Sequence, residues 1–296
     1  MLTGLCAYPL TPFHQGRPDE AGFGRLMERV RRARVDSICV LGSTGNFASM
    51  TRQERARIAR QAVEQAAGIP VVVGVSALSS RDVLDLAQDA QQAGAAAVML
   101  SPMCYQVLRD HEVYALFRSL SEAASVPLVV YDNPATTHFA CSDELLAQLA
   151  ALPQVRAIKI PAVPLLLPQA QERMGRLRAL LPSGVSVGVS GDASAVAGLL
   201  AGCEAWCSVL GGLFPQDMLA ICRVAQAGQE RPAQALSARW QSVWDLNARY
   251  GSLRVLATAA ELLGLVSAPC LPAPLQSLGE PGRTELKTTL ARLGLY

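Results

Sequence analysis

Eight short, almost continuously apolar segments recur between residues 5 and 212, and they constrain the fold of this 296-residue chain more than any other feature. The segments begin at Leu5, Ser37, Val71, Ala97, Leu128, Arg156, Val185 and Ala205. Uninterrupted apolar runs of this length are typical of strands buried on both faces of a parallel sheet. Amphipathic segments with helix start signals separate them, such as the capping box Thr51-x-x-Glu54 and Ser142 ahead of an acidic first turn. The pattern therefore predicts a repeated strand–helix unit.

The repeat favours an α/β fold, namely a (β/α)8 TIM barrel with a C-terminal helical appendage. Eight such units have the size and rhythm of this barrel. The strand signal stops after Phe214, so we expect residues 1–224 to form the barrel and residues 225–296 to form a helical segment packed on it. A doubly wound sheet is the alternative, but its first turn is usually rich in glycine, whereas this chain reads YPLTPF there.

Charge and hydropathy exclude several classes of protein. The net charge is +2, from 26 basic and 24 acidic residues, which leaves no electrostatic footprint for nucleic acid. The densest basic stretch, residues 29–34, is interpreted as the solvated face of a helix. No apolar run reaches the roughly 20 residues that a membrane span needs, and no secretory signal is visible. We therefore expect a soluble cytoplasmic protein with neither nucleic-acid nor membrane partners.

The cysteines and histidines indicate neither disulfides nor a metal site. Eight cysteines are scattered along the chain without a C-x-x-C pair, and the three histidines do not stand at ligand spacing. We expect reduced thiols and no bound metal.

Lys159 is the strongest candidate for chemistry, because it stands in the apolar run AIKIPAV at a predicted strand end. Function in a TIM barrel collects at the C-terminal ends of the strands. Burial lowers the pKa of an ammonium and leaves a neutral amine that can attack a carbonyl to form an imine. The alternative is a structural lysine paired with a core carboxylate such as Asp132 or Asp192. The strand alone does not separate these two hypotheses.

Two other strand ends carry hydroxyl groups. Tyr131 closes the fifth strand, where it is either a packing residue or, beside a Schiff-base lysine, a proton shuttle. Ser43 and Thr44 lie between glycines after the second strand, and their hydroxyls and backbone N–H groups suit either a bound carboxylate or an ordinary tight turn.

Taken together, these motifs resemble the dihydrodipicolinate synthase / N-acetylneuraminate lyase family of class I aldolases. The resemblance rests on GSTG at Gly42, on Y-x-x-P at Tyr131, on I-K at Lys159 and on SGD at Ser190. The interval from Tyr131 to Lys159 (159 − 131 = 28) is also that of the family. The resemblance covers essentially the whole chain and resolves the hypotheses for Lys159 in favour of chemistry.

The resemblance implies a role for each matching residue. Lys159 would form the imine with pyruvate or a related 2-oxo acid, Tyr131 would transfer protons, and Ser43 would hydrogen-bond the Tyr131 hydroxyl. Thr44 and its backbone N–H would bind the substrate carboxylate, which Ser43 would help to hold, and Gly42 would be a further substrate-binding residue. The rest of the substrate pocket would be lined by Ser190, Gly191, Asp192, Thr137, Cys207 and Tyr105. The partners would be a small-molecule 2-oxo acid and an aldehyde, the assembly a homotetramer (dimer of dimers) or a homodimer, and no cofactor would be needed.

The chain also departs from the family pattern. True dihydrodipicolinate synthases carry an arginine where this chain has Thr136, and loss of that bidentate donor disfavours their aldehyde substrate. The tyrosine that the family supplies across the dimer interface is either Tyr105 or has been replaced by Cys104. Asn46 stands in place of a glutamate, and Asp132 in place of an asparagine. We therefore expect a lyase with a different aldehyde partner, one that is hydroxylated or neutral.

Two alternative functions remain at this stage. A phosphate-binding TIM-barrel enzyme would use the turns at Ser190 and at Gly211-Gly212, although no basic anchor stands there. A catalytically altered family member would serve instead as a 2-oxo acid binding protein.

Overall fold

The fold is a closed barrel of eight parallel strands, as predicted. A computed structural model describes residues 2–296. The strands follow one another around the barrel in chain order and the last pairs with the first. They are β1 (Gly4–Ala7), β4 (Ser37–Val40), β5 (Val71–Gly74), β6 (Ala97–Leu100), β7 (Leu128–Tyr131), β8 (Val155–Ile160), β9 (Ser186–Ser190) and β10 (Ala205–Ser208). The doubly wound alternative is therefore excluded.

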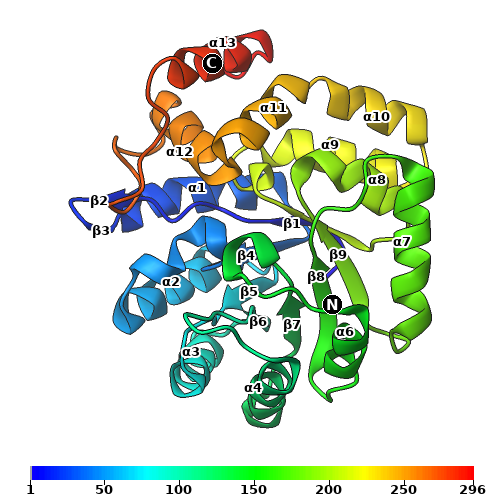
Figure 1. The fold of residues 1–296 in the computed structure, drawn as a ribbon. Coiled ribbons are helices and arrows are strands. Elements are labelled where there is room, and N and C mark those ends of the chain that lie inside the picture. The colour runs from blue at the N-terminus through cyan, green and yellow to red at the C-terminus, as the bar shows by residue number, and fades with distance from the viewer. Residues whose placement is uncertain (1) are drawn as a thin grey trace.

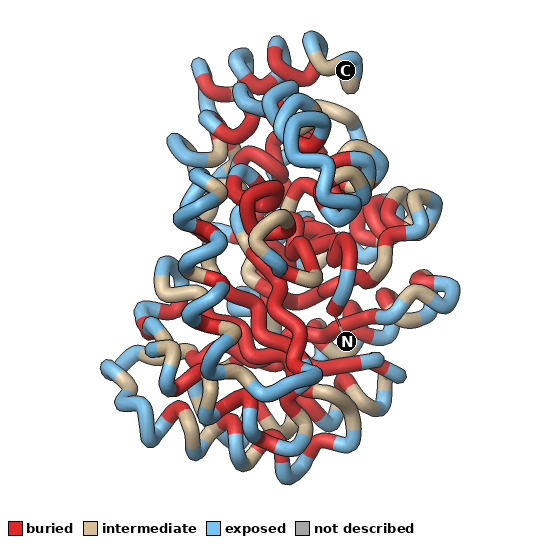
Figure 2. Tube along the Cα trace, turned by 90° about the vertical axis from the view of Figure 1, so that its right-hand side faces the viewer, coloured by how far each residue is buried: buried red, intermediate tan, exposed pale blue. Residues whose placement is uncertain are grey.

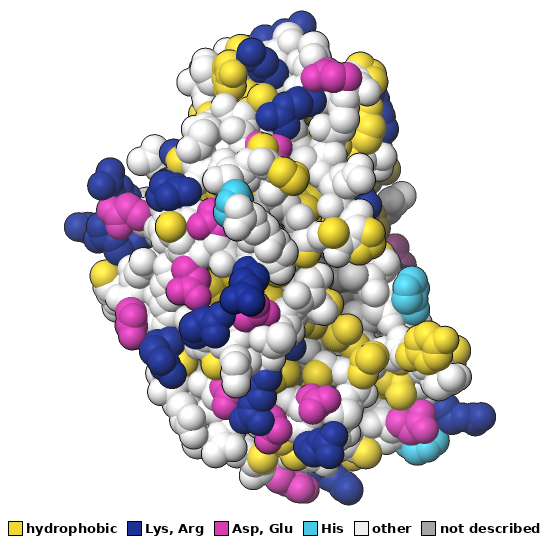
Figure 3. All heavy atoms as spheres, turned by 90° about the vertical axis from the view of Figure 1, so that its left-hand side faces the viewer, with side chains coloured by type: hydrophobic (Ala, Val, Ile, Leu, Met, Phe, Trp, Pro, Cys, Tyr) yellow, Lys and Arg dark blue, Asp and Glu magenta, His cyan; other side chains and the backbone are white. Residues whose placement is uncertain are grey.

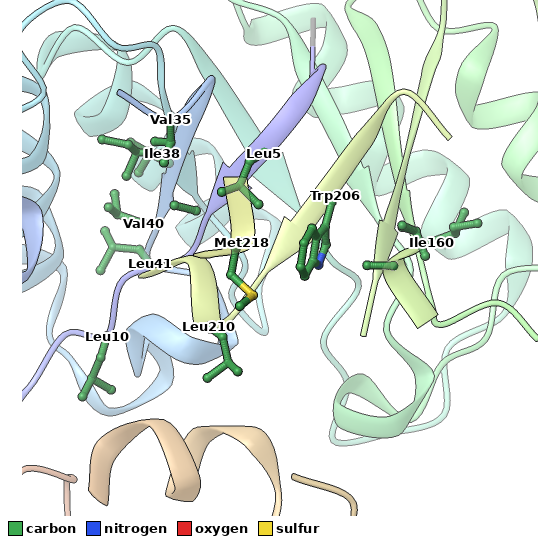
Figure 4. Close-up of a cluster of buried hydrophobic side chains, with 14 of the residues drawn as sticks. Leu5, Leu10, Val35, Ile38, Val40, Leu41, Ile160, Trp206, Leu210 and Met218 are labelled. Atoms are coloured by element: carbon green, nitrogen blue, oxygen red, sulfur yellow. The ribbon is translucent and has the colours of Figure 1, made fainter. Parts of the chain in front are cut away.

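The strands bury both faces, which explains why their sequences do not alternate between apolar and polar residues. Outward-facing side chains such as Leu5, Ile38 and Trp206 pack against the surrounding helices (Figure 4). Inward-facing side chains form a separate apolar cluster in the barrel interior that includes Cys6, Tyr8, Cys39, Met99, Val129, Tyr131, Ala157 and Cys207. Figure 2 shows the barrel strands as mostly buried, with exposed residues concentrated on the outer helices and loops.

A ring of helices surrounds the barrel (Figure 1). The ring consists of α1 (Glu20–Ala33), α2 (Arg52–Gln65), α3 (Ser80–Gln92), α4 (Asp110–Ala123), α6 (Asp143–Ala150), α7 (Leu167–Leu180), α8 (Ala195–Leu200) and α9 (Pro215–Gln226). The predicted capping box at Thr51 and Glu54 opens α2, and the Ser142 side chain caps α6. Both predicted helix starts are therefore confirmed. In each, the capping side chain accepts a hydrogen bond from an N–H group that the first helical turn leaves unpaired.

A small hairpin after β1 was not expected from the sequence. Its strands β2 (Phe13–His14) and β3 (Arg17–Pro18) are joined by Gln15 and Gly16, which both adopt positive φ, as a two-residue hairpin turn requires. The Phe13 N–H donates to the Cys270 carbonyl at 2.8 Å. The hairpin thus joins the first β/α loop to the proline-rich segment near the C-terminus.

The C-terminal segment is helical, as predicted, and extends over the barrel end that carries the site. It contains α10 (Glu230–Ala238), α11 (Gln241–Tyr250), α12 (Ser252–Leu262) and α13 (Gly282–Arg292). The last barrel helix, α9, runs to Gln226, so the predicted division after residue 224 falls inside this helix. Trp240 stacks on Trp244 at 6.1 Å and contacts Phe214 at 5.3 Å, which fixes α11 against the end of the barrel.

The surface carries charges of both signs. Figure 3 shows basic and acidic side chains interspersed across one face of the molecule. In the predicted solvated stretch, Arg31 and Arg32 both pair with Glu28 on α1. Across residues 2–296, no helix combines the length and the apolar character needed to cross a membrane.

Candidate active site

A cavity of about 890 Å³ opens at the C-terminal ends of the strands and brings together most of the predicted site residues. Loops after the strands supply one wall, and α11 and α12 supply the other. The predicted residues that line it are Ser43, Thr44, Tyr131, Thr137, Lys159, Ser190, Gly191, Asp192 and Cys207. Gly42 and Tyr105 do not line it.

Lys159 projects from β8 into the barrel interior at the floor of this cavity. It is in phase with the inward-facing Ala157, and its register partner on β7 is Tyr131. The Nζ atom lies 3.7 Å from the Tyr131 ring centroid and 3.9 Å from that of Tyr8. Among residues 2–296, no carboxylate lies within 4.0 Å of Nζ.

The two carboxylates proposed as structural partners of Lys159 are engaged elsewhere. Asp132 accepts a hydrogen bond from the Cys141 N–H at 3.2 Å. Asp192 accepts one from Trp206 Nε1 and one from the Leu210 N–H, each at 3.0 Å. Lys159 is therefore a buried cation without a structural counter-ion in the described chain, and the structural-lysine hypothesis is wrong.

The neighbours of Lys159 set its charge. Burial lowers the pKa of Lys159, but the ionised forms of Tyr131, Cys207 and Cys39 raise it, and the net pKa lies above its ordinary value. The expectation of a neutral amine is therefore wrong for the resting site. Lys159 rests as an ammonium held between two aromatic faces. Transfer of a proton from Lys159 to the ionised form of one of these neighbours removes the charge that raises its pKa. Burial then favours the neutral amine, which is the nucleophilic form.

The Tyr131 hydroxyl is held by Asn133, a residue that sequence reasoning overlooked. Asn133 Nδ2 lies 2.7 Å from Tyr131 Oη, 2.7 Å from Thr136 Oγ1 and 3.5 Å from Ser43 Oγ. The direct hydrogen bond from Ser43 to Tyr131 implied by the resemblance is not formed within the described residues; the amide stands between the two hydroxyls. Because the amide donates to Oη, the phenolic proton is left free for another acceptor.

The glycine-flanked turn after β4 presents Ser43 and Thr44 to the cavity. The turn is a 3₁₀ helix, η1 (Ser43–Gly45), and Gly42 precedes it. A Cβ on Gly42 would lie 3.3 Å from Met99 and 3.5 Å from the Tyr8 ring, so Gly42 provides space behind Tyr8 instead of contacting a ligand. Asn46 Nδ2 donates to the Thr11 carbonyl at 2.9 Å, so the residue in place of the family glutamate has a structural role.

The turn after β9 is held by internal hydrogen bonds. Ser190 Oγ donates to the Ile160 carbonyl, which ties β9 to β8. Gly191 has a φ of +85°, and a Cβ there would lie 2.9 Å from Ala162, so the turn requires glycine. Asp192 lies in the cavity wall, yet both of its oxygens serve Trp206 and Leu210. Burial raises the pKa of Asp192 against these hydrogen bonds.

The loop after β7 contains the short helix α5 (Pro134–Thr137). Thr137 lines the cavity, while its Oγ1 donates to the Asn133 carbonyl at 3.0 Å. Cys104 Sγ donates to the Thr137 carbonyl at 3.4 Å, whereas Tyr105 is 91% exposed and points away. Within one chain, neither Cys104 nor Tyr105 reaches Tyr131.

Cysteine side chains fill the barrel interior beneath Lys159. Cys6 on β1 and Cys207 on β10 are register partners, and Cys39 lies in the same cluster. A hydrogen bond with Cys6 lowers the pKa of Cys207 to about 7, against burial and with help from the Lys159 charge. All eight cysteines, which lie within the described residues, are free thiols.

Comparisons with known proteins agree with this architecture. The model of the dihydrodipicolinate synthetase family matches residues 1–293. A 4-hydroxy-tetrahydrodipicolinate synthase of Methylococcus capsulatus is 31% identical over 245 residues, which are 82% of each chain. The enzyme of that name from Gluconacetobacter diazotrophicus is 28% identical over 100% of this chain and 98% of its own.

Solved structures give the same result. A crystal structure described as dihydrodipicolinate synthase from Agrobacterium tumefaciens superposes with a TM-score of 0.95 at 38% identity, covering 99% of this chain and 98% of its own. One described as a putative dihydrodipicolinate synthetase from Pseudomonas aeruginosa has a TM-score of 0.91 at 30% identity, covering 99% of both chains. The chain therefore belongs to the dihydrodipicolinate synthetase family and is a lyase of the aldolase type.

Proposed function

We propose that the protein forms a Schiff base between Lys159 and pyruvate, or a related 2-oxo acid, and uses it for aldol cleavage or condensation. One observation carries the proposal. The chain has two lysines, of which Lys287 is exposed on α13, and the other is buried at the cavity floor without a carboxylate partner in the described residues. A buried cation is costly unless it has a use.

The site residues divide the chemistry among them. The Lys159 ammonium passes one proton to an ionised acidic neighbour, and the neutral amine attacks the C2 carbonyl of the 2-oxo acid. The Tyr131 hydroxyl gives its proton to the C2 oxygen to form a carbinolamine and takes one proton back from the nitrogen. It then delivers that proton to the new hydroxyl, which leaves as water and gives the iminium. The Tyr131 oxygen then accepts a C3 proton from the iminium, which gives an enamine. The enamine C3 attacks the aldehyde carbonyl, and Tyr131 protonates the resulting alkoxide; the reverse sequence cleaves the bond.

The remaining groups position the substrate. Ser43 and Thr44 present hydroxyls at the cavity wall, which suits them to bind the carboxylate of the 2-oxo acid. The faces of Tyr8 and Tyr131 stabilise the cationic iminium as they do the resting ammonium. Asn133 positions the Tyr131 hydroxyl.

The aldehyde half of the reaction differs from that of dihydrodipicolinate synthases, since Thr136 replaces the acceptor-binding arginine. The alternative of a phosphate-binding enzyme is less favoured, because the buried carboxyl group of Asp192 occupies the turn that would hold the phosphate. We propose a cytoplasmic homo-oligomer, either a homotetramer or a homodimer. The exposed Tyr105 and Val107, at 91% and 89%, are apolar side chains suited to a subunit contact.

Exchange of the pyruvate methyl protons with deuterated water tests the chemistry without knowledge of the aldehyde. The wild-type protein should exchange these protons, since enamine formation removes a C3 proton reversibly. Lys159→Met should abolish exchange, and Lys287→Met, at the other lysine, should leave it unchanged. Undiminished exchange in Lys159→Met would refute the assignment of Lys159, and binding of pyruvate without exchange would favour a 2-oxo acid binding protein.

A further inference from the structure

The cavity is far larger than pyruvate needs, and its outer wall comes from the C-terminal helical segment. At about 890 Å³ it lies within the range of roughly 300–1,000 Å³ that holds drug-sized ligands. Residues of α11 and α12 and the link between them line this outer wall, including Trp244, Asn247, Gly251, Ser252 and Arg254. The second half of the substrate therefore contacts the helical appendage as well as the barrel loops.

Arg254 places a second cation in the cavity wall. It is the one arginine among the lining residues, and it is exposed. Its Nη1 atom lies 3.7 Å from the position that a Cβ on Gly251 would take, so the guanidinium folds back over a residue that also lines the cavity.

The guanidinium of Arg254 has no protein counter-ion among residues 2–296, where no carboxylate lies within 4.0 Å of it. Its neighbours differ, because Arg249 pairs with Glu285 at 2.9 Å and Arg283 pairs with Glu261 at 2.8 Å. The one carboxylate in the cavity wall, Asp192, is committed to Trp206 and Leu210. The charges open to a ligand are therefore both positive, with Lys159 at the floor and Arg254 at the outer wall.

Asn247 is another polar residue of the same wall. The Asn247 side-chain oxygen is buried and has no hydrogen-bond donor within the described residues. An unsatisfied buried acceptor costs about 1–3 kcal/mol, and this oxygen is covered by protein, so it leaves Arg254 as the group of this wall that a ligand can reach. Thr136, on the facing wall, offers a hydroxyl and no charge.

We propose that Arg254 is a specificity-determining residue that binds an anionic group, a carboxylate, at the end of the substrate remote from the imine. The inference rests on the proposed function for the site at Lys159 and names the substrate class, a 2-oxo acid with a second, distal carboxylate. A substrate with a distal carboxylate differs from the hydroxylated or neutral partner expected from the sequence. That expectation considered only the residues in the loops after the strands.

Matched ligands that differ only in the distal group test the proposal. Calorimetric titration compares 2-oxoadipate with 2-oxohexanoate, which have the same number of carbons, and 2-oxoglutarate and 2-oxopimelate vary the reach. The wild type should bind the best diacid about tenfold to a hundredfold more tightly than its monoacid counterpart, the range expected for hydrogen bonds to a charged group. Arg254→Met should remove this preference, Arg254→Lys should retain part of it, and pyruvate binding should not change.

Arg249→Met is the matched control, because Arg249 pairs with Glu285 on the same helical segment and does not line the cavity. It should keep the preference for the diacid. Equal affinities for all diacids and monoacids in the wild type, or a preference that survives in Arg254→Met, would overturn the proposal. Borohydride trapping of pyruvate on Lys159 is measured separately. If no adduct forms but the preference for diacids still depends on Arg254, the imine is refuted and the role of Arg254 is supported.

Discussion

Substitution of Asn133 by leucine tests how the Tyr131 hydroxyl is controlled. Leucine keeps the approximate volume of the side chain and removes the amide that lies 2.7 Å from Tyr131 Oη. The backbone role of Asn133, whose carbonyl accepts from Thr136 and Thr137 at the start of α5, does not depend on the side chain. One neutral hydrogen bond contributes about 0.5–1.5 kcal/mol, which corresponds to about a two- to thirteenfold change in rate.

The assay is methyl-proton exchange of pyruvate, measured as a function of pyruvate concentration. We expect the maximal exchange rate of Asn133→Leu to fall by about two- to thirteenfold, since the loss concerns one hydrogen bond to the proton-transfer group, while half-saturation changes little. Thr136→Val is the control, because it removes the second contact of the amide and leaves the contact with Tyr131 in place. It should show the smaller loss. An unchanged maximal rate in Asn133→Leu, or a change confined to half-saturation, would refute the positioning role.

Two further predictions concern ionisation. The ultraviolet absorbance of thiolates should rise with pH, with a midpoint near pH 7, the pKa of Cys207. Cys207→Ser should remove this rise, and Cys6→Ala should move its midpoint to higher pH. A rise near pH 7 that persists in Cys207→Ser would contradict the assignment. Glu261→Gln should lower the unfolding free energy by about 1–3 kcal/mol, because Glu261 accepts hydrogen bonds from Cys270, Ser277 and Arg283. Burial raises the pKa of Glu261, but these hydrogen bonds outweigh it and the folded pKa is lowered. Chemical denaturation should therefore show the full difference in unfolding free energy between the wild type and Glu261→Gln at pH values above the ordinary glutamate pKa. This difference should disappear as the pH falls through the pKa of Glu261 in the folded protein. A difference in unfolding free energy that does not depend on pH would refute this prediction.

The barrel and the placement of Lys159 in its interior could be predicted because their signals are local. Each strand is a short apolar run that needs no distant partner to be recognised, and the helix caps at Thr51 and Ser142 depend on residues three positions apart. Lys159 and Tyr131 are conspicuous because each is a polar group within such a run. Their pairing in register is seen only in the structure, because the register between β7 and β8 shifts at Leu128 and Val129.

The rest of the site depends on contacts that local sequence does not encode. Tyr8 was read as part of a first strand and turn, and its place beside Lys159 follows only from closure of the barrel. The charge of Lys159 was predicted from burial alone, whereas thiols and phenols from three other strands reverse the direction of the pKa shift. Arg254 lies in a helical segment without a motif, and only the packing of α12 over the barrel end brings it to the cavity.

Borohydride reduction in the presence of pyruvate tests the central claim most directly, because the chain has two lysines. Mass spectrometry of the digested protein should place the reduced pyruvate adduct on the peptide that contains Lys159. The adduct should be absent from Lys159→Met and undiminished in Lys287→Met. Absence of an adduct from the wild type, or an adduct that persists at full yield in Lys159→Met, would contradict the account.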